Sequence, residues 1–464
     1  MTKILLIDLT ILGMAALMGI MLIFIIRGRS NLLEFGSLSF PIGAGTLTLI
    51  LFLSSWVGVP YTKMTLIGIY IGLFAVLCCG AILVRRRSGR QKAQADAAST
   101  PEASLGLRML FYAILFLCFL VIAHLSVTRS YSTWDEIGIW GIKGYGIAKE
   151  GTIFAGERWG SHGLTYPLNI PLQISIFRLL DGDVLPGSKL IFPMYFISLI
   201  LGAYQFWKNH TEWKFAAMGA LLLASLPIVF EHGTIGYANL PFAAYLVLGL
   251  LHVLEGISSG DARGQILGGF LLGLATWTRP EGIFLVIFSL GAVLIGSRAL
   301  KFGEIRLFAV LSPVLLIAGI WQGFSASIGS QGLVGSALQS AWRSWSQMEF
   351  HPGALYWTAR YLARQSLELK IWGVLVPLIL LVLAANFRKL RPREYPLPFL
   401  LLAAGTVVGG AVALYYYLAS FVSDLVYLLG TSFNRLFLPA WILVVLWIVL
   451  IAGLPGNVRM ENSG

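Results

Sequence analysis

Long apolar runs separated by short polar stretches cover almost the whole of this chain. A helix that crosses a lipid bilayer needs about 20 apolar residues, and fewer where protein shields it. The first run is too long for a signal peptide and has no small-residue cleavage site before Arg27, so we interpret it as a helix. We predict thirteen transmembrane helices on this pattern: 4–26, 41–58, 64–84, 109–127, 190–207, 215–230, 240–256, 266–278, 283–297, 307–324, 371–386, 397–417 and 437–453.

The composition excludes a water-soluble protein. Of the 464 residues, 57% are hydrophobic and only 12% are charged, with a mean hydropathy of +0.81. A soluble domain carries about 25% charged residues, so this chain cannot cover a water-facing surface of its own size. The predicted fold class is therefore an all-α, multi-pass membrane protein.

The net charge of +12 does not indicate nucleic-acid binding. Basic residues stand in short clusters between apolar runs, for example at 27–29, 85–92, 298–306 and 388–393, where they contact anionic lipid headgroups and set the orientation of the chain. By the positive-inside rule these clusters face the cytoplasm, which fits the cell (plasma or inner) membrane. The short connections on the opposite side carry few basic residues: Lys3, Lys63, Arg279 and Arg435.

We predict a catalytic core preceded by an accessory membrane segment. The parts are an accessory three-helix segment at 1–84, a basic cytoplasmic linker at 85–108, a transmembrane core at 109–456 and a cytoplasmic tail at 457–464. The three cysteines, at positions 78, 79 and 118, lie inside apolar runs and match neither a disulfide framework nor a metal site.

Two loops on the non-cytoplasmic side are long, 128–189 and 325–370, and loops of this length are usually functional. We expect interfacial helices in both. In the second loop aromatic and Met side chains recur at three-residue spacing, which favours a helix that either caps a cavity or anchors the loop in the membrane. Those side chains are Trp342, Trp345 and Met348, followed by Tyr356 and Trp357.

The first long loop begins with an acidic pair, Asp135 and Glu136, directly after the 109–127 helix. Acidic side chains at a membrane boundary are costly to leave unpaired. A carboxylate here can act as a general base towards a hydroxyl group. The structural alternative is a helix N-cap, in which Thr133 or Asp135 accepts hydrogen bonds from free backbone N–H groups.

Further polar residues fall on the same side of the membrane, and each also has a structural interpretation. Arg279 and Glu281 can pair with each other, Asn239 can cap the helix that follows it, and His162 is either a solvated side chain or a ligand. Together these residues predict a one-sided polar cavity above an apolar body. The candidate residues besides the acidic pair are Lys143, Arg158, Tyr166, Glu231, Asn239, Arg279, Glu281 and Arg435.

Four short motifs carry a resemblance to a known family. They are Trp134-Asp135-Glu136, a YPLxxP element at 166–171, GYANLP at 236–241 and TRPEG at 278–282. In this order and on this side of the membrane they resemble the GT-C superfamily of polytopic glycosyltransferases, most of all its protein-mannosyltransferase and aminoarabinose-transferase branch. The resemblance covers roughly 109–300, with a looser match at Asn434-Arg435.

The resemblance implies a sugar donor linked to polyprenyl phosphate, used on the non-cytoplasmic face with inversion. It implies that Asp135 is the catalytic base and that Glu136 binds the acceptor or orients the base. Lys143, Arg158, Tyr166 and Arg435 are then the candidates for holding the donor phosphate or lipid. The alternative for the three cations is a lipid-headgroup contact or a surface charge.

The same resemblance leaves the acceptor open among glycans, lipids and proteins. It implies membrane lipids as surroundings and no nucleotide or other cofactor, and it leaves a divalent metal open, although no metal-ligand cluster is visible in the sequence. The chain departs from the family in having Thr165-Tyr166-Pro167 where His-Pro-Pro is common, and Asn239 where Asp is common.

Three other functions compete with this interpretation, and one of them is a structural or assembly subunit without enzymatic activity. A polymerase or ligase of lipid-linked glycans also has many spans and a large outer loop, but concentrates Arg and His late in the chain. A secondary transporter predicts repeated halves and ionisable residues near mid-membrane. Apart from Asp8, the apolar runs carry almost no charge.

Overall fold

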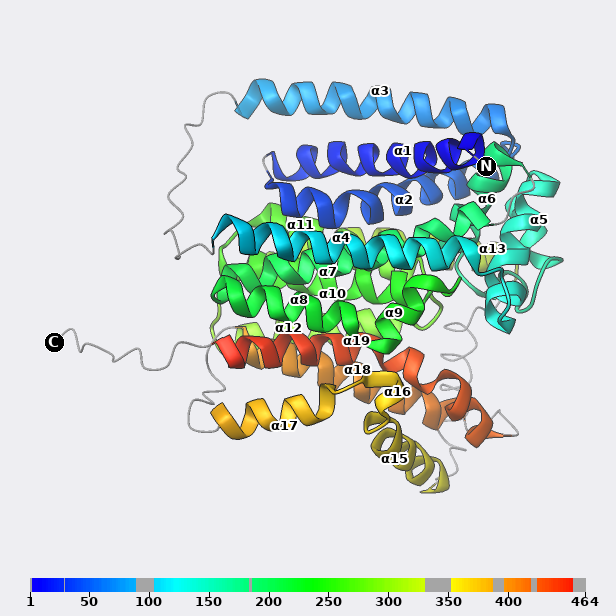
Figure 1. Ribbon diagram of the computed structural model, residues 1–464. Helices are drawn as coiled ribbons and strands as arrows, with labels where there is room; N and C mark the ends of the chain where they lie inside the picture. The colour runs from blue at the N-terminus through cyan, green and yellow to red at the C-terminus, as the bar shows by residue number, and fades with distance from the viewer. Residues whose placement is uncertain are drawn as a thin grey trace.

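The protein is a bundle of helices that run side by side (Figure 1). The computed structural model describes residues 2–28, 30–88, 104–182, 186–329, 352–386, 396–418 and 424–453. Within these ranges the secondary structure is helical, without strands. Ten helices are long and apolar enough to cross a membrane, or eleven if one bent pair counts as a span. The all-helical, multi-pass architecture predicted from the sequence is confirmed.

The helices follow one another through the chain with short connections. The first half contains α1 (Thr2–Arg27), α2 (Leu32–Trp56), α3 (Lys63–Ser88), α4 (Leu105–Thr128), α5 (Ile142–Glu150), α6 (Asn169–Asp181), α7 (Ile191–His210), α8 (Trp213–Ser225) and α9 (Pro227–Thr234). The second half contains α10 (Asn239–Ser258), α11 (Ala262–Thr276), α12 (Gly282–Ala299), α13 (Leu307–Ser327), α15 (Pro352–Ser366), α16 (Leu369–Trp372), α17 (Leu375–Asn386), α18 (Leu397–Leu418) and α19 (Leu425–Gly453).

Every predicted span falls on a helix, but three of them are not full spans. The run 266–278 forms α11, which has 15 residues, and the run 371–386 forms α17, which has 12. The run 215–230 is broken, because Leu226 is extended and Pro227 starts a new helix, so α8 and α9 meet at a bend of 61°. Proline lacks the N–H group that would continue the hydrogen bonds of α8, and its ring disfavours a helical conformation at the residue before it, Leu226.

The first two helices are packed closely against each other and against the rest of the bundle. A Cβ atom on Gly19 of α1 would lie 1.7 Å from the carbonyl oxygen of Ser39 in α2, so the two backbones touch where a glycine allows it. Thr48 of α2 donates a hydrogen bond of 2.7 Å to Asn169 of α6. By contrast α3 lies at the edge of the bundle, with only 6% of its span buried (Figure 1).

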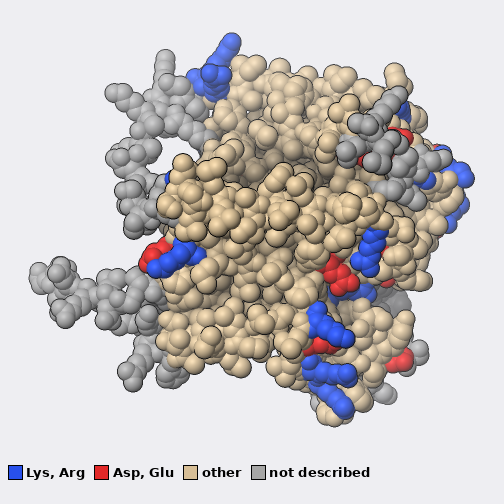
Figure 2. Space-filling model, in the orientation of Figure 1, with Lys and Arg blue, Asp and Glu red and all other residues tan. Residues whose placement is uncertain are grey.

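The two ends of the bundle differ. At one end, which we call the α5 end, α5 lies crosswise to the long helices, together with three short turns, η1 (Glu136–Gly141), η2 (Ile153–Glu157) and η3 (Gly163–Thr165) (Figure 1). The opposite end carries Arg27, the last residue of α1. Figure 2 shows that charged side chains gather near the two ends of the visible face and that its middle carries none. This distribution suits a bilayer-embedded middle.

Some predictions lie outside the described residues. These are the linker residues 89–103, the tail 457–464 and the side chains Trp342, Trp345 and Met348. The part of the second long loop that is described forms α15 and α16, and α15 carries the exposed Tyr356.

Candidate functional site

A cavity of about 860 Å³ opens at the α5 end of the bundle. Residues from the first long loop, α9, the connection after α11, α16 and α19 meet around it, so parts of the chain up to 300 residues apart form one site. Its polar and aromatic lining includes Trp134, Asp135, Trp140, His162, Tyr166, Glu231, His232, Tyr237, Arg279 and Arg435.

Asp135 forms an ion pair with Arg435 on the wall of the cavity. Both side chains are partly exposed, Asp135 to 23% and Arg435 to 19%. The Arg435 guanidinium also stacks over the ring of Tyr237, 5.0 Å from its centroid. Asp135 makes no capping hydrogen bond to the turn that follows it, so the helix-cap alternative is wrong for this residue.

That following turn, η1, is a single turn of π-helix. Turns of this kind are rare and occur often at functional sites.

Glu136, by contrast, is completely buried and points away from the cavity. One carboxylate oxygen accepts hydrogen bonds from the backbone N–H of Ser132 at 3.0 Å and of Thr133 at 3.2 Å. The other accepts from the backbone N–H of Gly236 at 2.7 Å and pairs with Lys189 Nζ at 2.6 Å. Burial alone would raise the pKa of Glu136, but the hydrogen bonds and the Lys189 charge outweigh it and lower the pKa.

This arrangement makes Glu136 the clamp that joins the first long loop to the connection before α10 and to the start of α7. A substrate cannot reach its oxygens without displacing the chain's own donors. Gly236 is required here, because a Cβ atom on it would lie 2.6 Å from Cγ of Glu136.

The opposite wall carries Glu231 and His232 of α9. Glu231 is exposed, and its carboxylate makes no hydrogen bond or ion pair within the described part of the chain. His232 is 3% exposed, and neither ring nitrogen has a hydrogen-bond partner among the described residues. These two side chains are therefore free to bind a ligand.

Arg279 lies between this wall and the bundle. It pairs with Glu281, which confirms the pairing expected from the sequence, and donates a hydrogen bond to Oδ1 of Asn239. Asn239 therefore braces Arg279 and does not cap α10, so the capping prediction is wrong. Asn239 and Glu281 are both buried behind the cavity wall.

Aromatic rings line the side of the cavity formed by the first long loop. The centroid of the Tyr166 ring lies 4.9 Å from that of His162 and 5.8 Å from that of Trp140. The centroids of the Trp134 and His162 rings are 6.4 Å apart. Burial raises the pKa of Tyr166 to about 12, so this hydroxyl stays protonated at neutral pH. Burial and the nearby Lys143 charge lower the pKa of His162, against the opposing effect of Asp135.

Two predicted phosphate ligands lie away from the cavity. Lys143 is fully buried, and its ammonium donates hydrogen bonds to the carbonyl oxygens of Gly163 at 2.5 Å and Ser161 at 3.4 Å. Burial lowers its pKa to about 8, partly countered by Glu157. Arg158 is exposed and pairs with Glu150. Lys143 thus holds the loop together, and neither side chain lines the cavity.

Three residues of this site are not among the candidates that the sequence predicted. Lys189 precedes an apolar run and looks like an ordinary headgroup contact, yet it is the buried partner of Glu136. His232 and Tyr237 lie in the connection around α9, where a histidine beside Glu231 was a usable signal. The described residues contain no group of three or more His, Cys, Asp or Glu side chains that could hold a metal ion.

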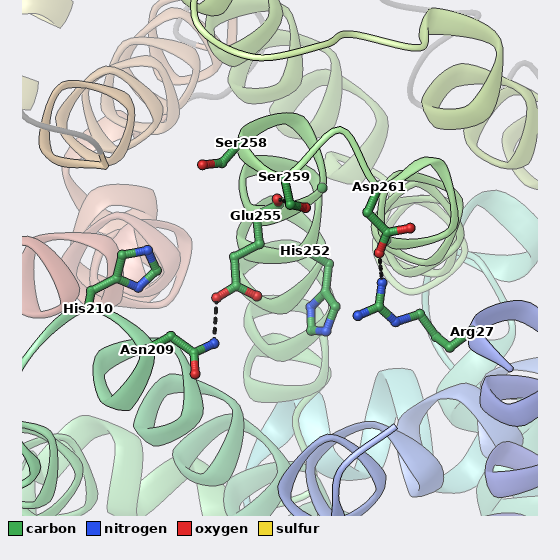
Figure 3. Close-up of a pocket in the computed structure, with 10 residues that line it drawn as sticks. Arg27, Asn209, His210, His252, Glu255, Ser258, Ser259 and Asp261 are labelled. Atoms are coloured by element: carbon green, nitrogen blue, oxygen red, sulfur yellow. Dashed lines mark hydrogen bonds and ion pairs between the residues drawn. The ribbon is translucent and has the colours of Figure 1, made fainter. Parts of the chain in front are cut away.

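A second hollow, of about 290 Å³, lies at the opposite end of the bundle (Figure 3). Arg27 pairs there with Asp261, and Asn209 donates a hydrogen bond of 3.0 Å to Glu255 (Figure 3). Arg27 also pairs with Glu34 of α2. These contacts join the end of α1 to α2 and α11, and the end of α7 to α10. The cavity at the α5 end is the better candidate for a reaction site.

Comparisons with protein-family models, with curated proteins and with solved structures find no match for this chain. A proposal for the function of this protein therefore rests on the arrangement of the cavity.

Proposed function

We propose that this protein is an integral membrane glycosyltransferase. It transfers a sugar from a polyprenyl-phosphate donor to an acceptor hydroxyl by inverting displacement. The observation that carries the proposal is the Asp135–Arg435 pair on the wall of a cavity at one end of a bundle of apolar helices. A carboxylate and a guanidinium side by side are the two groups that this reaction uses.

The proposed step begins with the donor phosphate binding to Arg435. A guanidinium binds phosphate through two parallel hydrogen bonds, so the phosphate competes with Asp135 for the same donors. Asp135 then takes the proton of the acceptor hydroxyl. The hydroxyl oxygen forms a bond to the anomeric carbon, and the bond from that carbon to the phosphate oxygen breaks with its electron pair leaving on the phosphate. Arg435 stabilises the charge that develops there.

The remaining walls of the cavity suit the sugar and the polyprenyl chain of the donor. The aromatic rings of Trp134, Trp140 and Tyr166 offer flat faces and polar edges for a sugar. Apolar side chains on the same cavity offer a surface for a polyprenyl chain: Ile139, Ile228, Ile235, Ile371 and Leu428. The positive-inside rule supports a site on the non-cytoplasmic face of the plasma or inner membrane, since the described basic residues that end α1 and α3 lie at the end of the bundle opposite α5.

The test compares two matched changes of a carboxylate that pairs with an arginine. Purified protein receives a panel of polyprenyl-phosphate sugars and a crude membrane acceptor extract, and release of polyprenyl phosphate is measured. Asp135→Asn should lower turnover by about 10²- to 10⁴-fold, the usual contribution of a general base. Glu150→Gln, whose carboxylate pairs with Arg158 away from the cavity, should leave turnover unchanged.

Equal turnover in the two variants would overturn the assignment of Asp135 and direct attention to Glu231. Release of polyprenyl diphosphate in place of the monophosphate would favour the polymerase or ligase alternative. Solute movement across proteoliposomes without any release of a polyprenyl product would favour the transporter.

A further inference from the structure

A third hollow, of about 490 Å³, lies beside the cavity, between the end of α4 and α9. Six residues line it: Leu125, Thr128, Arg129, Phe230, Glu231 and Thr234. Glu231 is the residue that this hollow shares with the cavity lining. The bend between α8 and α9 gives α9 its separate direction and so places Glu231 between the two spaces.

Two opposite charges face this hollow without pairing. Arg129 and Glu231 are both exposed, and no hydrogen bond or ion pair of either side chain occurs within the described ranges. Two such exposed groups, one at the end of α4 and one on α9, lose little by staying apart, but they present a donor and an acceptor to a ligand that reaches both. The volume lies in the range of about 300–1,000 Å³ that is usual for ligand sites.

The surroundings of the hollow are those of the lipid layer. Only 22% of the α4 span is buried, and its outward side chains are apolar, with Leu117 exposed to 60% and Val121 to 41%. These residues lead along α4 to Leu125, which lines the hollow, and then to Arg129, the residue that directly follows the helix. An apolar helix flank that ends in an arginine corresponds to the level of acyl chains followed by the level of headgroups.

We propose that this hollow binds the headgroup of an anionic lipid that carries a phosphate and a free hydroxyl. The phosphate binds Arg129, the hydroxyl donates a hydrogen bond to Glu231, and an acyl chain follows Leu125 and Phe230. Because Glu231 also lines the cavity, the bound hydroxyl is presented at the edge of the reaction site. That this lipid is the acceptor rests on the proposed glycosyltransferase function; that the hollow binds it does not.

The test measures lipid binding directly. The full-length protein in lipid nanodiscs or detergent receives phosphatidylglycerol, phosphatidic acid or phosphatidylcholine, and bound lipid is counted by native mass spectrometry. Phosphatidylglycerol offers both a phosphate and hydroxyls, and phosphatidic acid offers the phosphate without the glycerol hydroxyls. We expect phosphatidylglycerol to bind best.

Three variants separate the contacts. Arg129→Gln should weaken binding of phosphatidylglycerol and phosphatidic acid about tenfold, as expected for the loss of one charge-assisted hydrogen bond. Glu231→Gln should reduce phosphatidylglycerol binding towards that of phosphatidic acid. Arg360→Gln, an exposed arginine of α15 outside both spaces, is the matched control and should bind lipid as the wild type does.

Equal binding by the Arg129→Gln and Arg360→Gln variants, or no preference for phosphatidylglycerol over phosphatidylcholine, would overturn the lipid site. Unchanged discrimination in Glu231→Gln would overturn its role in holding the hydroxyl. The two proposals can fail separately. Lipid binding that depends on Arg129, without turnover of any donor, would overturn the glycosyltransferase proposal. Turnover of a donor, with lipid binding that does not depend on Arg129, would overturn the lipid site.

Discussion

Removing the charge of Glu136 tests whether this residue is a structural clamp. In Glu136→Gln the side chain keeps its size, but Lys189 loses its buried counter-ion. An amide N–H₂ group replaces an oxygen that accepts either from Gly236 N–H or from both Ser132 N–H and Thr133 N–H. Lys189 keeps the carbonyl oxygens of Arg129 at 2.9 Å and Ser130 at 3.4 Å and its contact with the ring of Tyr131. The ammonium is then buried without a counter-ion.

The expected loss is large because both members of the pair are fully buried. Breaking a buried ion pair by removing one partner costs about 3–5 kcal/mol. With about 2 cal/mol/K of unfolding entropy per residue, a chain of 464 residues loses about 1 °C of melting temperature per kcal/mol. We therefore expect Glu136→Gln to melt about 3–5 °C below the wild type.

Thermal unfolding of the purified protein in detergent, read by intrinsic fluorescence, measures this shift. A double-mutant cycle with Lys189→Gln isolates the pair, and the double variant should lose much less than the sum of the two single variants. An unchanged melting temperature together with a complete loss of sugar transfer would refute the clamp, since it would show that Glu136 contacts a substrate.

Three further predictions follow from close packing, buried charge and the cavity. Gly19→Ala should lower the free energy of unfolding by about 1–3 kcal/mol, and with it the melting temperature, because its methyl group meets Ser39. Gly13→Ala on the same helix, where a Cβ atom meets nothing within 4 Å, should leave the melting temperature unchanged. Equal shifts in the two variants would contradict the close packing of α1 on α2. The pKa of Lys143 is about 8 in the folded protein against an ordinary 10.5. Between these two pH values the unfolded chain binds a proton that the folded protein has lost, so the free energy of unfolding should rise with pH. Denaturant unfolding from pH 7 to 10 should show this rise in the wild type and not in Lys143→Met. Arg435→Lys keeps the charge but loses the planar fork, so donor turnover should fall about tenfold with little change in melting temperature, and a normal turnover rate would exclude bidentate phosphate binding.

The helices are the part of the structure that the sequence predicts best. Apolar runs in a membrane protein have one stable conformation, because every backbone N–H and C=O group must be bonded internally. The runs therefore predict helices reliably, but not whether a helix is long enough to span. At 215–230 the hydropathy is continuous, and only the backbone angle at Leu226 before Pro227 shows where α8 stops.

The membership of the candidate site was only partly predictable, and of its pairings only Arg279–Glu281 was expected from the sequence. Asp135 and Arg435 could both be placed on one side of the membrane from loop charges, but they meet across 300 residues through the packing of α19. Lys143 was predicted to belong to the site but does not line the cavity. A lysine among aromatic and apolar residues looks like a headgroup contact in sequence, and only the folded loop shows that carbonyl oxygens surround it.

The acidic pair shows how two adjacent carboxylates acquire different tasks. Successive residues on a helical turn point in directions about 100° apart, so when Glu136 turns into the protein Asp135 must face elsewhere. The bonds of Glu136 to Ser132, Gly236 and Lys189 fix that turn on both sides. The position of Asp135 beside Arg435 is thus set by its neighbour's burial. It follows that a change at Glu136 should reduce activity through the geometry of Asp135, in proportion to the loss of stability, while a change at Asp135 should reduce activity and leave stability nearly intact.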